Sequence, residues 1–266
     1  MYPELFKIGP LVISSFGAML VIAFLMCNYL LKKEMVNNNL DENLADELTT
    51  RAAIGGIVGA KSYYIIENIP NGSLGDTFDG LINIIMGVVT FDSTSLSSGI
   101  QNIGAGLVFY GGLIGGMIAI TLFIRKEKLV WLDIADWVAP YLALGHSIGR
   151  IGCFLVGDDY GKPTDSWVGI AFPNGLPPTF IPVYPTQLFE MAAYFIVFLY
   201  LRFMRSKEPC SGNLMFKYLI LVGLSRFIIE FIRINPKYLI GLSGAQIISI
   251  IMMVIGSALY IKINKK

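Results

Sequence analysis

Residues 130–156 read VWLDIADWVAPYLALGHSIGRIGCFLV, and this stretch decides the fold class. An apolar run of about 20 residues is long enough to cross a hydrocarbon core of about 30 Å as a helix. Comparable runs recur along the whole chain, and they predict helices near 10–31, 51–67, 104–124, 130–156, 185–204, 214–234 and 240–262. We therefore predict an all-α membrane protein with about seven transmembrane helices.

The overall composition indicates the same class. Hydrophobic residues make up 55% of the chain and charged residues only 15%, whereas ordinary soluble domains contain about 25% charged residues. The mean hydropathy is +0.64, and no stretch is left over for a soluble domain, so we predict one integral membrane domain over residues 1–266. A formal net charge of +1 argues against a nucleic-acid partner, because no basic face accumulates outside the loops.

Two longer segments separate the predicted helices. Residues 68–102 are rich in Gly, Ser, Asn and Asp around an apolar patch at 81–91, which is too short to span the bilayer and is expected to lie along its interface. Residues 157–185 are rich in proline. We expect this second segment to be a structured excursion from the membrane.

Positive charges are distributed unevenly between alternate loops. The richer set comprises Lys32, Lys33, Arg125, Lys126, Lys128, Arg202, Arg205, Lys207, Lys262, Lys265 and Lys266. The poorer set contains only Lys7, Lys162 and Lys237. Because cytoplasmic loops carry the excess of lysine and arginine, this pattern predicts an external N-terminus and a cytoplasmic C-terminus. That arrangement requires an odd number of crossings, and seven satisfies it.

The residues that commonly bind metals are few. Cys27, Cys153 and Cys210 lack the spacing of a metal motif, and an odd number of cysteines cannot form a complete disulfide framework. His146 is the only histidine, so a zinc site would need a carboxylate cluster that the sequence does not show. We expect neither a metal nor another cofactor.

Four cations fall inside predicted helices, namely Lys61, Arg150, Arg226 and Arg233. A charge near the bilayer centre costs about 2.5–3.5 kcal/mol, so such residues usually face a wet cavity or a partner. Pairing within one helix could explain two of them, because Glu230 lies four residues after Arg226 and three before Arg233. Arg150 has no acid within a turn of it on its own helix, so it needs another explanation.

Small residues flank Arg150. Gly149 and Gly152 would let a headgroup or another helix approach the backbone closely, and a guanidinium presents a planar fork that matches phosphate oxygens. This combination suggests a pocket for a phospholipid headgroup. Packing between helices is an alternative explanation for the glycines, but it leaves the arginine unexplained.

Several motifs, in order along nearly the whole chain, make the sequence similar to the bacterial prolipoprotein diacylglyceryl transferases. They are Gly59-Ala60-Lys61, Phe109–Gly115 (FYGGLIG), Gly149–Gly161 (GRIGCFLVGDDYG), Tyr184–Glu190 (YPTQLFE), Arg226–Arg233 (RFIIEFIR) and Gly241–Gln246 (GLSGAQ). One glycine motif alone would be weak evidence. Six in the expected order form a specific pattern.

The resemblance implies an activity. The family transfers the diacylglyceryl group of phosphatidylglycerol to the thiol of the lipobox cysteine in a prolipoprotein signal peptide, which forms a thioether and releases glycerol phosphate. It also implies a multi-pass protein of the bacterial cytoplasmic (inner) membrane, in contact with membrane lipids. The candidate catalytic residues are Arg150, Arg226 and Tyr110, which the resemblance points to, and His146, which lies one turn before Arg150. Those that the resemblance points to as substrate-binding are Arg150, Arg226, Arg233, Glu230, Lys61, Gly149, Gly152, Asp158, Gly161, Gln187 and Glu190.

The sequence also departs from the usual family pattern. Tyr110 and Tyr184 stand where many members have histidine, Cys153 where many have asparagine, Asp158 where many have glutamate, Phe16 where tyrosine is usual and Lys61 where arginine is usual. These differences leave the identity of the base that deprotonates the thiol open, since His146, one turn before Arg150, and Tyr110 are both candidates. A structural role for His146, as a hydrogen-bond donor between helices, is a further alternative.

Other functions compete with the transferase. A catalytically silent paralogue would keep the lipid site without the reaction. A lipid or anion transporter would also use intramembrane arginines, although no inverted repeat is visible in the sequence. A seven-helix receptor is indicated only by the helix count, which says little about function.

Overall fold

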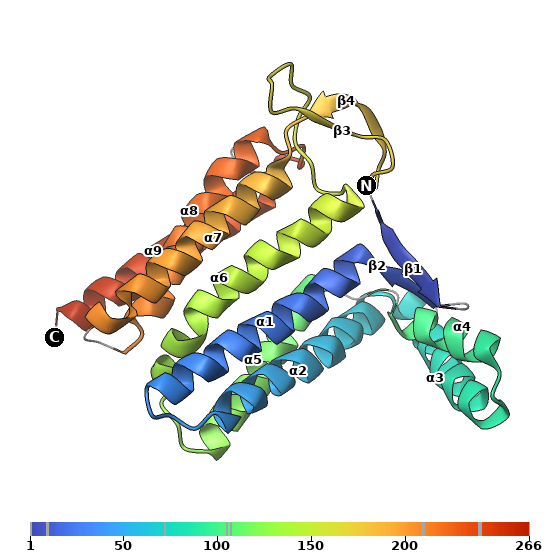
Figure 1. Cartoon of the computed structure of the whole chain (residues 1–266), viewed down its shortest axis with the longest axis horizontal. Coiled ribbons are helices and arrows are strands. Elements are labelled where there is room, and N and C mark those ends of the chain that lie inside the picture. Colours follow the sequence, from blue (N-terminus) through green and yellow to red (C-terminus); the bar gives the residue numbers. More distant parts are fainter. Residues whose placement is uncertain are drawn as a thin grey trace. The chain divides into compact units, whose positions relative to one another are not determined.

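A computed structural model describes residues 2–8, 11–71, 73–104, 106, 108–208, 211–238 and 241–265, and most of them are helical (Figure 1). Cys210 lies outside the described residues. The chain divides into two compact units: residues 1–5, 14–34 and 130–266 form the first, and residues 6–13 and 35–129 form the second. The single domain over 1–266 stays a prediction.

The first unit is a helical bundle. Its helices are α1 (Ser15–Asn37, up to Glu34), α6 (Trp131–Val156), α7 (Thr186–Met204), α8 (Asn213–Ile229) and α9 (Gly244–Asn264). Helix α6 packs against α7 and α8, and α8 also packs against α7 and α9 (Figure 1). Buried apolar side chains such as Ala139, Leu201 and Val222 line the interior of this bundle.

A small sheet lies between α6 and α7 in the chain. Strands β3 (Ile170–Phe172) and β4 (Thr179–Val183) pair antiparallel, with Ile170 opposite Val183 and Phe172 opposite Thr179. Phe172 is fully buried, and its ring stacks on Tyr160 with a centroid distance of 5.5 Å. The expected excursion at 157–185 is therefore structured. A second two-stranded sheet consists of β1 (Glu4–Ile8) and β2 (Leu11–Ser14). The described fold is thus mostly helical, but it also contains short strands that the all-α prediction did not include.

Helices α6 and α9 each have a well-defined cap at one end. Helix α6 ends at Gly157, whose φ of 76° lies in the left-handed region that glycine tolerates, and its N–H donates to Cys153 O at 2.8 Å. Helix α9 begins after Ser243, which forms a capping box with Gln246. Helix α8 ends at Ile229, and the 3-10 helix η3 (Glu230–Ile232) follows it.

A buried ionic group lies near the other end of α6. Glu34 on α1 pairs with Arg205 in the 3-10 helix η2 (Arg205–Lys207), with 2.9 Å between Oε1 and NH1. Tyr141 on α6 donates to the same carboxylate, and Arg205 NH2 donates to Asp136 O at 2.9 Å. These contacts tie α1, α6 and the end of α7 together.

The second unit is built on α2 (Asn43–Glu67) and α5 (Phe109–Lys126), which pack along each other. Glycines of both helices lie at the contact between α2 and α5. A Cβ added at Gly59 would lie 2.3 Å from Gly111 O and 2.7 Å from Gly115 Cα. No side chain fits there, so the backbones touch. The 3-10 helix η1 (Ile69–Asn71) and a helical hairpin of α3 (Ser73–Thr90) and α4 (Ser93–Gly104) lie between them in the chain. The apolar patch at 81–91 therefore belongs mostly to a longer helix, and its place at the interface stays a prediction.

Four described helical segments are long and apolar enough to cross a membrane, namely Ser15–Asn37, Phe109–Lys126, Thr186–Lys207 and Gly244–Asn264. The other predicted spans are more polar or shorter: α2 carries four charged residues in the sequence NLADELTTRAAIGGIVGAK alone, α6 contains Arg150, and α8 has 17 residues. A helix of that length extends about 26 Å. The total of seven spans and the orientation of the termini stay predictions.

Several predicted boundaries are wrong. Helix α1 runs to Asn37 and not to 31, so Lys32 and Lys33 lie on the helix. Helix α2 begins at Asn43 and not at 51. Its first eight residues are helical but mostly polar, so hydropathy did not indicate them. Residue 104 ends α4, and α5 starts only at Phe109. Arg233 follows η3 in extended conformation and does not belong to a helix.

Candidate active site

Three arginines of the first unit converge on one carboxylate, that of Glu190 on α7. Arg150 on α6 approaches it with Nε 2.5 Å from Oε2. Arg226 on α8 donates from NH1 to Oε1, and Arg233 NH1 lies 3.8 Å from Oε1. Glu190 is fully buried. Arg150 has no acid within a turn of it on its own helix, and Glu190 from the neighbouring helix α7 is its acidic partner.

Glu230 forms the second acidic contact of this cluster. Its Oε2 lies 3.2 Å from Arg226 NH2 and 3.5 Å from Arg233 Nε, so the pairs that residue spacing allowed are present, although Arg233 lies beyond the helix. Its Oε1 accepts hydrogen bonds from Ser243 Oγ at 2.8 Å and Asn235 Nδ2 at 2.5 Å. The sequence did not suggest these two polar partners, because they lie in segments that reach Glu230 only through the fold.

Asp159 forms the third acidic contact, and no pattern in the sequence singled it out. Its Oδ2 accepts from Arg150 NH1 at 2.8 Å, and its Oδ1 accepts from Arg233 NH2 at 2.6 Å. Its φ of 60° places it in the left-handed region, which aspartate tolerates better than most residues. Burial alone would raise the pKa of Asp159, but Arg233 and Arg150 outweigh it, and the pKa is lowered. Asp159 is thus held as a carboxylate.

Asp158 and Gln187 lie beside this cluster. Gln187 is fully buried and donates from Nε2 to the main-chain oxygen of Asp158. Burial, and then the charge of Asp159, raises the pKa of the Asp158 carboxyl. Within the described part of the chain, Asp158 Oδ1 and Gln187 Oε1 are buried and have no hydrogen-bond partner. Asp158 therefore borders Arg150 and Arg233, and both predicted residues have a buried polar atom without a partner among the described residues.

The three predicted glycines have different surroundings. A Cβ at Gly152 would lie 3.1 Å from Phe16 Cδ2 on α1, so this glycine serves the packing of α6 against α1. A Cβ at Gly161 would lie 2.6 Å from Ile232 O, so this glycine lets the excursion pass close to η3. A Cβ at Gly149 would meet nothing within 4 Å. Only Gly149 thus leaves space for a ligand next to Arg150.

His146 lies one turn before Arg150 on α6. Its side chain is exposed, and its Nδ1 lies 3.4 Å from the hydroxyl of Tyr218. The ring of Tyr194 lies 5.5 Å away, centroid to centroid. These neighbours could orient the imidazole, and neither tyrosine was identified from the sequence.

Lys61 and Tyr110 belong to the second unit. Lys61 is buried on α2, and its Nζ donates to Asn102 O at 2.9 Å. Tyr110 on α5 is half exposed and packs edge-on against Phe109. Their predicted roles in catalysis and substrate binding stay predictions.

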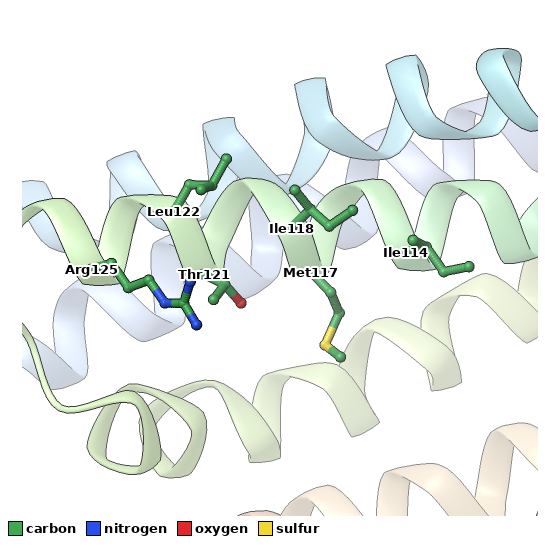
Figure 2. Close-up of a pocket in the computed structure, with 6 residues that line it drawn as sticks. All are labelled: Ile114, Met117, Ile118, Thr121, Leu122 and Arg125. Carbon is green, nitrogen blue, oxygen red and sulfur yellow. The ribbon is translucent and has the colours of Figure 1, made fainter.

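A shallow pocket in the second unit runs along one side of α5, where Figure 2 shows the residues that line it. They are Ile114, Met117, Ile118, Thr121, Leu122 and Arg125. All come from a single helix and most are apolar, which is typical of a helix face in contact with lipid. This pocket lacks the convergent polar groups of the arginine cluster.

Cys153, Asp158 and Asp159 offer ligand atoms within 4.8 Å of one another, a spacing that could hold a metal ion. However, Arg150 NH1 contacts both Cys153 Sγ, at 3.6 Å, and Asp159. The guanidinium already supplies the positive charge at this place and would repel a metal cation. The geometry therefore favours binding of an anion by the arginines.

Arg150 and Arg226 are each about one-fifth exposed, so they can still be reached by a ligand. Among the described residues, none accepts a hydrogen bond from Arg150 NH2. Guanidinium groups on two neighbouring helices, oriented by a buried carboxylate, match the planar geometry of a phosphate. The cluster is thus suited to bind a phosphate group at the end of the bundle that carries the excursion.

Comparison with known proteins agrees with this chemistry. The family model described as prolipoprotein diacylglyceryl transferase matches residues 3–262. A phosphatidylglycerol–prolipoprotein diacylglyceryl transferase of Clostridium tetani is 33% identical, with 96% of this chain and 95% of that protein covered. The corresponding transferase 2 of Clostridium perfringens is 35% identical, with 97% and 94% covered. That of Chlorobaculum tepidum is 34% identical, with 96% and 88% covered. The chain therefore belongs to the prolipoprotein diacylglyceryl transferase family.

Proposed function

We propose that the chain transfers the diacylglyceryl group of phosphatidylglycerol to the lipobox cysteine of prolipoproteins, the first step of lipoprotein maturation. The relatives are named for this donor and this acceptor. The observation that carries the proposal within this chain is the convergence of Arg150 and Arg226 on the buried carboxylate of Glu190.

In the proposed reaction, the cysteine sulfur forms a bond to the glyceryl carbon that bears the phosphate ester. The bond between that carbon and the ester oxygen breaks, and its electron pair stays on the oxygen of the departing glycerol phosphate. The thiol proton passes to a base, because the thiolate is the nucleophile. The products are a thioether and a phosphate monoester.

Arg150 and Arg226 are proposed to bind the phosphate and to stabilise the charge that develops on it as the carbon–oxygen bond breaks. Glu190 orients both guanidinium groups, and of their atoms it contacts only Nε of Arg150 and NH1 of Arg226. Glu230, in η3, and Arg233, directly after η3, contact the same cluster, and Arg233 is proposed as a further contact of the phosphate. Pre-oriented donors of this kind favour the transition state because they need no rearrangement during the reaction.

Two side chains are candidates for the base. His146 is exposed and lies on the same helical face as Arg150. To act as a base, Tyr110 would need a nearby cation that stabilises its phenolate. As a neutral group, Tyr110 could still donate a hydrogen bond to the headgroup.

The proposed topology places the site where both substrates can reach it. With seven spans and an external N-terminus in the bacterial cytoplasmic membrane, the 157–185 excursion faces outside. The arginine cluster borders this excursion through Asp159 and Gly161. It would then lie near the outer leaflet headgroups and near the lipobox of an exported signal peptide.

A complementation experiment tests the function. The gene is expressed in bacteria depleted of their own diacylglyceryl transferase, and the lipidation of a reporter lipoprotein is measured by mass spectrometry. Restored lipidation supports the transferase, whereas a well-expressed, folded protein that fails to restore it indicates a silent paralogue. Release of glycerol phosphate by purified protein, dependent on a lipobox peptide, separates the enzyme from a transporter.

A further inference from the structure

The carboxylate of Asp159 bridges two arginines with two different oxygens. Oδ2 lies 2.8 Å from Arg150 NH1, and Oδ1 lies 2.6 Å from Arg233 NH2. A phosphate group also offers adjacent oxygens to two guanidinium groups. The side chain of Asp159 therefore occupies a place that an anionic ligand of the same arginines would take.

The side chain of Asp159 can leave this place without unfolding the loop. Its side chain is 43% exposed, whereas its main chain is held by separate contacts. The main-chain oxygen accepts from Thr186 Oγ1 at 2.6 Å and from Arg233 NH1 at 3.0 Å. Rotation of the carboxylate away from the arginines would leave these two hydrogen bonds in place.

We propose that Asp159 competes with the phosphate group for Arg150 and Arg233, leaving the arginines when the lipid headgroup binds and returning as the phosphate product departs. The identity of that ligand rests on the proposed function. The competition itself requires only that the arginines bind an anion.

The charges of substrate and product explain why such a competitor is useful. The phosphate diester of a phospholipid carries one negative charge, whereas a phosphate monoester carries about −1.5 to −2 at pH 7. Arginines that bind the substrate would therefore bind the product more tightly. An internal carboxylate lowers the affinity for both and favours release of the product.

An alternative role for Asp159 gives the opposite prediction. If its carboxylate only held Arg150 and Arg233 in place for the ligand, its removal would disorder them and weaken anion binding. The direction of the change in affinity therefore distinguishes competition from support.

The test measures binding of glycerol phosphate to the purified full-length protein in detergent by isothermal titration calorimetry at pH 7.5. Asp159→Asn removes the charge, keeps the side-chain shape and suits the φ of 60°. Asp159→Gly removes the side chain and also suits this backbone. We expect both variants to bind glycerol phosphate about tenfold more tightly than the wild type, which corresponds to about 1.4 kcal/mol.

Asp165→Asn is the matched control, because Asp165 is an exposed acid of the same excursion and has no ion pair among the described residues. Its affinity should equal that of the wild type. Unchanged or weaker binding by folded Asp159→Asn and Asp159→Gly would overturn the competition, as would a complete lack of binding by every form. If both variants bind glycerol phosphate more tightly but the wild type shows no diacylglyceryl transfer, the competition is upheld and the proposed function is refuted.

Discussion

Glu190→Gln should abolish most of the activity and also destabilise the bundle. The substitution keeps the shape of the side chain but removes the charge that Arg150, Arg226 and Arg233 share. Glu190 is fully buried, and removing one partner of a buried ion pair costs about 3–5 kcal/mol. We therefore expect the melting temperature in detergent to fall by on the order of 10 °C.

The effect on turnover follows from the loss of orientation. Arg150 and Arg226 approach the same carboxylate from two helices, so without its charge the two guanidinium groups repel each other and shift. A displacement of about 1 Å in a positioning group can reduce the rate by about 10²-fold. The assay is transfer of radiolabelled diacylglyceryl from phosphatidylglycerol to a lipobox peptide, with kcat expressed per folded protein.

Glu34→Gln is the matched control, because Glu34 is also a buried acid of the bundle and pairs with Arg205 at 2.9 Å. It lies in the ionic group near the other end of α6, so it should lower the melting temperature while changing kcat little. If Glu190→Gln proved folded with a near-normal kcat, Glu190 would not position the arginines and the proposed phosphate site would be wrong.

Three further predictions address the chemistry and the topology. Arg150→Lys keeps the charge but loses the planar fork, so kcat should fall by about 10²–10³-fold; near-normal turnover by both Arg150→Lys and Arg150→Ala would show that this arginine is structural. Tyr110→Phe should lower kcat if the hydroxyl contacts the headgroup, and His146→Gln should lower it if the imidazole takes the thiol proton; if both variants keep full activity, the base must be another group. Single cysteines at Glu127 and Lys162 in a cysteine-free protein should react oppositely with a membrane-impermeant thiol reagent in intact cells. We expect labelling at 162 only, and the reverse result would contradict the proposed orientation.

The arginines could be predicted from the sequence because a charge inside an apolar helix needs a partner. For Arg226 the helical spacing also indicated Glu230, and the structure contains that pair. For Arg150 the spacing indicated no acid on its own helix. Its partner Glu190 comes from α7, and only the packing of α6 against α7 brings the two side chains together.

Asp159 and the end of α8 could not be predicted for a different reason. The role of Asp159 depends on a positive φ and on the path of the loop after Gly157, neither of which leaves a periodic pattern in the sequence. Apolar residues continue beyond Ile229, so hydropathy extended the helix to 234. The helix ends earlier, at Ile229, and the next residue, Glu230, accepts hydrogen bonds from Asn235 and Ser243. These two donors are polar, so hydropathy could not indicate them.

Ser243 links the order of synthesis to the assembly of the arginine cluster. Its hydroxyl both caps α9 and donates to Glu230, yet α9 follows every other helix in the chain. During translation, Arg150, Glu190 and Arg226 emerge before the residue that completes the contacts of Glu230. Until α9 arrives, the carboxylate of Glu230 lacks the hydrogen bond from Ser243, so the contacts of Glu230 are completed only when this helix has been inserted.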